Sequence, residues 1–156
     1  MIDGTTRVFA LLGDPVAHSL SPAMQNAAFR ALGLPAVYVP LRCSTDDVPP
    51  LVRALTRAGG GGNVTVPHKE TAAAAVDRCL ESAEIAGACN TFWGEDGRSM
   101  GDNTDVTGVL VALKGLDAPS GPWLVAGTGG GARAAVIAAG RRGAAVAISS
   151  RSEQRR

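Results

Sequence analysis

Stretches with the periodicity of β-strands alternate with stretches with the periodicity of α-helices along this 156-residue chain. The strands are predicted at residues 7–12, 36–41 and 63–66, and the helices that follow them at residues 22–32, 46–58 and 70–78. Strands that alternate with helices form a mainly parallel sheet whose faces the helices cover. The sequence therefore predicts an α/β fold.

Residues that favour helix starts mark several boundaries. Ser21 is expected to cap the first helix, Ser44 or Thr45 the second, and Asn103 a later helix at residues 104–114. The sequence also predicts a short helix at residues 81–85 and a strand pair at residues 88–93 and 98–101. We expect these elements to form a first domain over residues 1–104.

The composition changes at residues 115–122, where prolines and glycines predict a linker. Beyond it the sequence predicts a strand at residues 123–126, a helix at 132–142 and a strand at 144–149. We expect residues 105–156 to form a linking helix and the first part of a Rossmann-type domain.

A glycine-rich turn joins the first strand of this second domain to its helix. The turn, Gly127-Thr128-Gly129-Gly130-Gly131-Ala132, matches the GxGxxA pattern of dinucleotide-binding turns. In that pattern the glycines permit a tight turn and close approach to a pyrophosphate, and the helix start attracts phosphate charge. A flexible loop in a glycine-rich chain is the alternative, but the strand–turn–helix context favours nucleotide binding.

The residues after the last predicted strand indicate which dinucleotide is bound. An NAD site places an acidic residue there to hold the ribose hydroxyls, whereas this chain has Ser149-Ser150-Arg151-Ser152. An arginine flanked by hydroxyls suits the 2′-phosphate of NADP. Glu153 follows slightly late, so NADP is favoured over NAD.

The overall composition excludes several classes of function. A net charge of +1 gives no electrostatic basis for binding nucleic acid or membranes. The three cysteines lack CxxC spacing and the two histidines lie far apart, so neither a disulfide framework nor a metal site is predicted. No apolar run is long enough for a membrane span, and no signal peptide is evident. We expect a cytoplasmic monomer or homodimer that binds a small molecule.

Lys69 and Lys114 are the only lysines in a chain that otherwise uses arginine. A lysine can give up its proton in a suitable environment, whereas an arginine effectively cannot. Taken alone, Lys69 is more consistent with a solvated surface charge. However, further polar clusters follow or precede predicted strands at residues 18–22, 89–91 and 101–105. Because ligands of open α/β sheets bind at strand ends, these clusters predict a pocket for a small polyhydroxylated ligand, in which Asp105 orients the Lys69 ammonium group.

The same residues resemble the shikimate dehydrogenase family in motif and in order. The resemblance comprises GxPxxHSxSP at residues 13–22, NVTxPxK at 63–69, GAxNT at 87–91, GDNTDxxG at 101–108 and GxGGxxR at 127–133. It implies an NADP-dependent oxidoreductase that interconverts 3-dehydroshikimate and shikimate in chorismate and aromatic amino-acid biosynthesis. Five ordered motifs are far more specific than any one of them.

The resemblance also implies roles for individual residues. Lys69 would be the catalytic acid/base, paired with Asp105. The substrate would be bound by Ser19, Ser21, Thr65, Asn90 and Asp105. The cofactor would be bound by Glu81, Gly127, Thr128, Gly129, Gly130, Gly131, Ser150, Arg151, Ser152 and Arg155.

The chain departs from the family in two substitutions and in length. Gln25 replaces a histidine, and Cys89 replaces a small apolar residue. Family members are much longer, so we expect a C-terminally truncated chain that lacks part of the cofactor sheet. Two alternatives stay open: a shikimate-binding protein without turnover, and a quinate/shikimate dehydrogenase of broader specificity, against which Ser19 together with Arg151 weighs.

Overall fold

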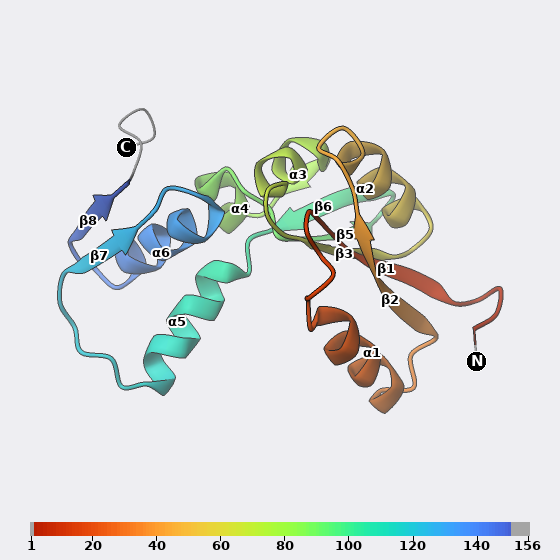
Figure 1. Ribbon diagram of the computed structural model, residues 1–156, viewed down its shortest axis with the longest axis horizontal. Helices are drawn as coiled ribbons and strands as arrows, with labels where there is room; N and C mark the ends of the chain where they lie inside the picture. The colour runs from red at the N-terminus through yellow and green to blue at the C-terminus, as the bar shows by residue number, and fades with distance from the viewer. Residues whose placement is uncertain (1, 151–156) are drawn as a thin grey trace.

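The computed structural model describes residues 2–150, which form two sheets connected by helix α5 (Figure 1). The strands are β1 (Arg7–Gly13), β2 (Ala36–Arg42), β3 (Gly61–Val64), β4 (Arg78–Cys79), β5 (Thr91–Glu95), β6 (Arg98–Asp102), β7 (Trp123–Ala126) and β8 (Val146–Ser149). The helices are α1 (Ser21–Ala31), α2 (Val48–Arg57), α3 (Lys69–Ala75), α4 (Glu81–Ala86), α5 (Asp105–Gly115) and α6 (Gly130–Arg141). None of these described helices is long and apolar enough to cross a membrane.

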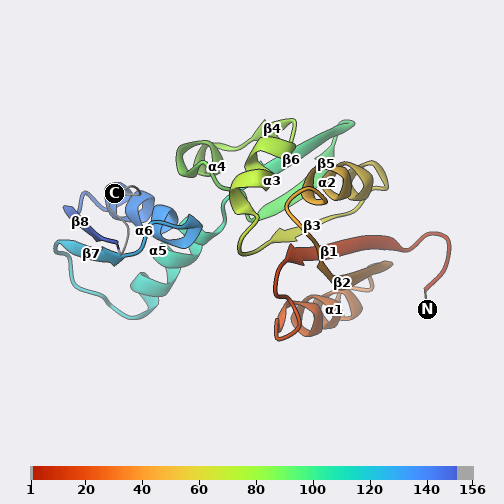
Figure 2. The same ribbon diagram turned by 45° about the horizontal axis from the view of Figure 1, so that its top comes forward.

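The larger sheet has six strands in the order β2-β1-β3-β5-β6-β4. The pairs β1–β2, β1–β3 and β4–β6 are parallel, while β5 is antiparallel to both of its neighbours. Helices α2 and α3 lie on one face of this sheet and α1 lies on the other (Figures 1 and 2). The prediction of an α/β fold with a mainly parallel, helix-covered sheet is confirmed.

The two faces of the larger sheet bury different amounts of apolar surface. Under α2 and α3, Leu12, Val52 and Phe92 are almost completely buried in the larger core cluster. On the other face a smaller cluster is centred on Leu11 and Tyr38, and α1 itself contributes no buried residue. Because α1 covers only part of its face, room is left beside it for a cavity.

The smaller sheet pairs β7 with β8 in parallel, and α6 connects the two strands. Val106 of α5 and Ala134 and Ala138 of α6 are fully buried in a core that Trp123 helps to close. Leu124 is 75% exposed, because strand alternation directs it away from that core. Within residues 2–150, the smaller sheet is therefore covered on one face only.

The predicted caps of α1 and α2 are both wrong by one or more residues. The N-cap of α1 is Leu20, so Ser21 is the first helical residue, and the Ser19 Oγ atom accepts its N–H (3.2 Å). The N-cap of α2 is Asp47, whose carboxylate accepts the N–H and the hydroxyl of Ser44 at 2.8 and 2.6 Å. The Ser44 hydroxyl donates to this carboxylate and precedes the helix instead of capping it.

The start of α5 and the ends of two other elements also differ from the prediction. Thr104, not Asn103, is the N-cap of α5. Helix α3 ends at Ala75, because the chain then pairs with β6 as strand β4. Strand β3 begins at Gly61 rather than at residue 63, since a Cβ atom on Gly62 would lie 2.0 Å from the Ala10 carbonyl oxygen. The glycines predicted to form a turn thus permit close strand pairing.

Candidate functional site

Polar residues from four connections meet at one edge of the larger sheet. Strands β1, β3 and β6 all end at this edge, and the antiparallel strand β5 begins there. The edge borders a cavity of about 480 Å³ beside α1. The cavity is lined by all six predicted catalytic and substrate-binding residues: Ser19, Ser21, Thr65, Lys69, Asn90 and Asp105.

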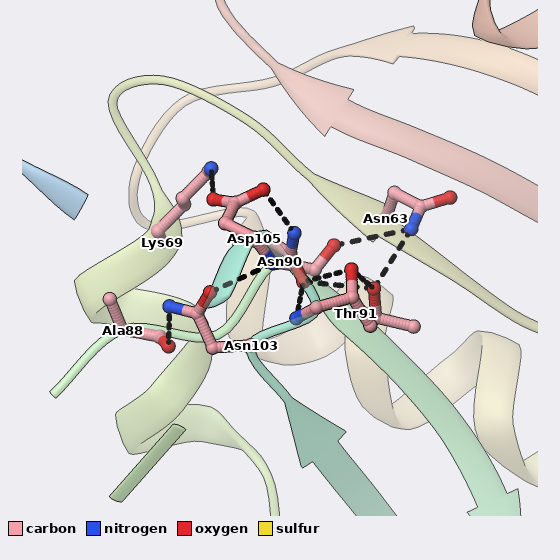
Figure 3. A network of polar contacts seen from close by, with 8 residues as sticks. Asn63, Lys69, Ala88, Asn90, Thr91, Asn103 and Asp105 are labelled. Carbon is pink, nitrogen blue, oxygen red and sulfur yellow. Dashed lines mark hydrogen bonds and ion pairs between the residues drawn. The ribbon is translucent and has the colours of Figure 1, made fainter. Parts of the chain in front are cut away.

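Lys69 and Asp105 form an ion pair on the cavity wall. The Lys69 Nζ atom lies 2.5 Å from Asp105 Oδ2, and the two side chains are 18% and 32% exposed. The other carboxylate oxygen, Oδ1, accepts a hydrogen bond of 2.7 Å from the Asn90 amide nitrogen. Both Asp105 oxygens are therefore held in place, and the carboxylate fixes the direction of the ammonium group (Figure 3).

Asn90 is itself held by a ring of donors. Its Oδ1 atom accepts the N–H of Thr104 (3.0 Å) and the hydroxyls of Thr91 (2.9 Å) and Thr104 (3.1 Å). Since each of these partners donates, the amide must turn its NH₂ group toward Asp105. Asn90 thus connects the starts of β5 and α5 to the ion pair through hydrogen bonds.

The start of α3 positions Lys69 through backbone and buried side-chain contacts. His68 is 2% exposed, and its Nε2 atom donates to the Cys43 carbonyl at 2.9 Å, because a carbonyl can only accept. The His68 N–H donates to the Thr65 carbonyl, which closes the turn after β3. The Lys69 carbonyl accepts the N–H of Cys89 (2.8 Å), so the segment before β5 is tied directly to the lysine.

Asn63 lines the same cavity but was not predicted as a substrate-binding residue. Its Nδ2 atom donates to the Thr91 hydroxyl (3.1 Å) and the Asn90 carbonyl (3.3 Å), and its Oδ1 atom accepts the Tyr38 hydroxyl (2.8 Å). Burial raises the pKa of Tyr38 to about 12. The strand alternation that directs Val64 into the core directs Asn63 to the opposite face, and this pattern could have identified it.

Three further cavity-lining residues come from the connection after β1 and from α1. They are His18, Met24 and Gln25. The nearby Ser19 Oγ atom accepts a backbone N–H, so its own hydroxyl proton can be donated into the cavity. Gln25, noted above as a departure from the family pattern, therefore lies at the site.

The glycine-rich turn lies between β7 and α6, as predicted. Gly127 has φ +114°, a conformation that favours glycine, and its N–H donates to the Ser149 carbonyl (2.7 Å). Gly129 is the N-cap of α6, and no side-chain cap covers the first-turn N–H groups. A Cβ atom on Gly129 or Gly131 would meet no atom within 4 Å, so the turn is open to a ligand. Helix α6 starts at Gly130, two residues before the predicted start, which extends the helix toward the turn.

The remaining predicted cofactor residues are more dispersed. Thr128 is half-buried within the turn, and Ser150 follows β8 at the same end of the smaller sheet. The carboxylate of Glu81, at the start of α4, is 80% exposed and lies 3.7 Å from Arg141 of α6. Glu81 does not line the cavity. The predictions for Arg151, Ser152 and Arg155 fall outside the described residues.

Comparison with known proteins assigns the larger part of this chain to a family. Residues 11–92 match the shikimate dehydrogenase substrate binding domain. A shikimate dehydrogenase (NADP(+)) from Rubrobacter xylanophilus is 49% identical over 146 residues, which make up 91% of this chain and 51% of that protein. The chain spans about half the length of the curated relatives that it matches.

Solved structures agree with the sequence comparison. Shikimate 5-dehydrogenase from Thermus thermophilus, in complex with NADP(H) and shikimate, superposes with a TM-score of 0.88 at 42% identity over 96% of this chain and 57% of that one. The Listeria monocytogenes shikimate 5-dehydrogenase, in complex with shikimate and NAD, has a TM-score of 0.86 at 32% identity over 99% of this chain and 55% of that one. On these matches, together with the five ordered motifs, the chain belongs to the shikimate dehydrogenase family.

Proposed function

We propose that this chain provides the substrate site and the first part of the cofactor site of an NADP-dependent shikimate dehydrogenase, which interconverts 3-dehydroshikimate and shikimate. The observation that carries the proposal is the Lys69–Asp105–Asn90 chain of contacts on the wall of a cavity that further hydroxyl and amide side chains also line. A positioned ammonium–carboxylate pair can move a proton at a hydroxyl-bearing carbon. The names of the curated relatives agree with this activity.

The cavity offers distinct partners for the two ends of shikimate. Ser19 and Ser21 lie at the start of α1, where hydroxyl donors and the helix N-terminus favour a carboxylate. Asn90 and Asp105, next to the starts of β5 and α5, can bind ring hydroxyls, and Thr65 lines the same cavity. We therefore place the carboxylate near α1 and the reacting hydroxyl near Lys69.

Lys69 would act as the general acid and base of the reaction. NADP, when bound, supplies or accepts the hydride at the ring carbon that bears the reacting oxygen. In the reducing direction the Lys69 ammonium group donates a proton to that oxygen, and in the oxidising direction the amine removes it. Asp105 keeps Nζ directed at one place throughout, because its second oxygen is anchored to Asn90.

The glycine-rich turn is the proposed pyrophosphate site. Its open surface and the uncapped first turn of α6 suit the approach of phosphate oxygens to backbone N–H groups. We place the division between substrate and cofactor domains at residues 104 and 105, with Ser150, Arg151, Ser152 and Arg155 around the 2′-phosphate and Glu81 near the cofactor. Comparing NADP+ with NAD+ affinity would test the preference for the 2′-phosphate.

Lys69→Ala is the variant that tests the role of the lysine. We expect kcat to fall by a factor of about 10² or more, as for the loss of a general acid–base group, while shikimate binds nearly as well. An absorbance assay of NADPH and shikimate calorimetry measure the two quantities. Lys114→Ala, the other lysine, at the exposed end of α5, is the matched control. Unchanged turnover in Lys69→Ala would remove Lys69 from the mechanism.

A shikimate-binding protein without turnover is the second candidate function. It is favoured by the small cofactor sheet, which has two strands in the described part of the chain and is covered on one face only. The same pair of measurements separates the two candidates. Binding heat without NADPH turnover in the unmodified chain supports the second candidate, and turnover supports the first.

A further inference from the structure

Arg133 belongs to the GxGGxxR motif but has no role in the function proposed above. Its side chain leaves α6 and reaches the segments around Lys69. The Nη1 atom donates to the carbonyls of Ala86 (3.2 Å) and Gly87 (3.5 Å) at the end of α4. The Nη2 atom lies 2.9 Å from the carboxylate of Glu70, the residue that follows Lys69. One guanidinium group thus joins three elements.

Gly130 lies on the same face of α6 as Arg133, because residues three apart in a helix are neighbours. A Cβ atom on Gly130 would lie 3.1 Å from the Lys69 Cδ atom and 3.7 Å from the Ala88 Cβ atom. The first turn of α6 therefore packs directly on the lysine side chain. One turn further along α6, Arg133 binds Glu70 and the Gly87 carbonyl, which flank that contact.

We propose that Arg133 is a positioning residue that docks the first turn of α6 onto the Lys69 segment and so sets the distance between the glycine-rich turn and the lysine. A planar guanidinium suits this place, since it can bond two carbonyls and a carboxylate in fixed directions, whereas a lysine offers a point charge. The docking follows from the contacts alone, and its consequence for proton and hydride transfer rests on the proposed function.

The solvent exposure of the Arg133–Glu70 ion pair indicates which property of the protein Arg133 should affect. Arg133 and Glu70 are 40% and 62% exposed, and exposed ion pairs contribute little to the free energy of unfolding. By contrast, a misplacement of reacting groups by about 1 Å can lower a rate about 10²-fold. A variant at Arg133 should therefore change local docking and kcat far more than the melting temperature.

The test compares the full 156-residue chain with Arg133→Ala, Arg133→Lys and Glu70→Gln. Arg142→Ala is the matched control, because Arg142, at the C-terminal end of α6, also donates to a carbonyl, that of Ala118, but does not reach the larger sheet. Hydrogen–deuterium exchange of the ligand-free proteins reports docking at residues 84–90 and 127–133. Shikimate calorimetry and the NADPH assay report Kd and kcat.

In Arg133→Ala we expect exchange to rise at least about threefold in both segments, with an unchanged melting temperature and a shikimate Kd within about twofold. We expect kcat to fall about 10- to 100-fold, Arg133→Lys to recover part of it, and Arg142→Ala to match the unmodified chain. Glu70→Gln should show a smaller change in the same segments, and this variant tests the docking if Arg133→Ala does not fold.

Unchanged exchange, or raised exchange with unchanged kcat, overturns the proposal. If the unmodified chain shows no turnover, the proposed enzymatic function is contradicted instead. The hydrogen–deuterium exchange of the variants then tests the docking by itself.

Discussion

At the scale of single residues, Tyr38 acts on the cavity through another side chain. It is 3% exposed, and its hydroxyl group donates to Asn63 Oδ1. Because burial raises its pKa to about 12, the hydroxyl stays a donor across the whole neutral range. That donor fixes which end of the Asn63 amide faces Thr91, and so which groups face a ligand.

We expect Tyr38→Phe to weaken shikimate binding by about fivefold and to lower the free energy of unfolding by about 1 kcal/mol, the usual net value of one hydrogen bond. Calorimetry measures the binding and urea denaturation measures the stability. Phe29→Leu, in the same core cluster but without a polar contact to Asn63, is the control for packing. A shikimate Kd equal to that of the unmodified chain would show that Asn63 orients itself without Tyr38.

Asp77, in the connection between α3 and β4, makes contacts with β6 that depend on its charge. Its carboxylate accepts the N–H (2.7 Å) and hydroxyl (2.8 Å) of Ser99, and these bonds, the backbone one first, lower its pKa below the ordinary value. A carboxyl group whose pKa is lowered on folding stabilises the fold above its unfolded pKa. This stabilisation is lost as the pH falls through the folded pKa.

Asp77→Asn should therefore lower the melting temperature at pH 7, and the difference from the unmodified chain should shrink as the pH falls below about 4. Thermal scans between pH 7 and pH 2.5 measure this convergence. Asp46→Asn, an exposed aspartate just before α2, serves as the control. A difference that stays constant down to the lowest pH would assign the effect of the substitution to packing rather than to the charge of Asp77.

At the scale of secondary structure, the glycines of this chain have opposite functions in strand and helix. A Cβ atom on Gly62 of β3 would lie 2.0 Å from the Ala10 carbonyl oxygen, so the sheet backbone would have to move. At Gly108 of α5 a Cβ atom would meet nothing within 4 Å. Gly62 is required by close strand pairing, while Gly108 only adds conformational freedom to the unfolded chain.

We expect Gly62→Ala to lower the free energy of unfolding by about 3 kcal/mol or more and to weaken shikimate binding, since Asn63 follows directly. Gly108→Ala should raise the free energy of unfolding of the part that contains α5 by about 0.5–1 kcal/mol. Urea denaturation of the two variants gives both values. The account of β3 fails if the two alanines have effects of the same sign.

The sequence predicted well those elements that the type and order of their side chains determine. The apolar run of β1 and the polar clusters at the strand ends were sufficient to predict a pocket at this edge of the sheet, whereas the individual substrate-binding residues were implied by the family resemblance. The N-caps of α1 and α2 depend on backbone conformation, without a side-chain cap hydrogen bond, and strand β4 depends on its pairing with β6. The periodicity of the sequence records neither. Asn63 was placed in a predicted strand but not in the site, although its alternation with the buried Val64 directs it to the cavity face.

At the scale of the whole molecule, the described residues contain separate cores. The two clusters of the larger sheet comprise residues within 9–92, and the cluster of the smaller sheet comprises residues within 106–138. Between them lie the contacts of α4 with α6, which include the exposed pair of Glu81 with Arg141. Contacts of this kind are weaker than a shared core, so each part is expected to unfold on its own.

We therefore expect a calorimetric scan of the chain to show two transitions, of which shikimate shifts one. All the residues proposed to bind shikimate belong to the N-terminal part except Asp105, the first residue of α5. Shikimate at a hundredfold excess over its Kd stabilises the state that binds it by about 2.7 kcal/mol, which moves the transition of a domain of about 100 residues by roughly 10 °C or more. Quinate at the same concentration is a comparison ligand, and its shift measures the specificity of the cavity. A single transition that moves as a whole would instead mean that the α4–α6 contacts and Arg133 couple the two parts into one cooperative unit.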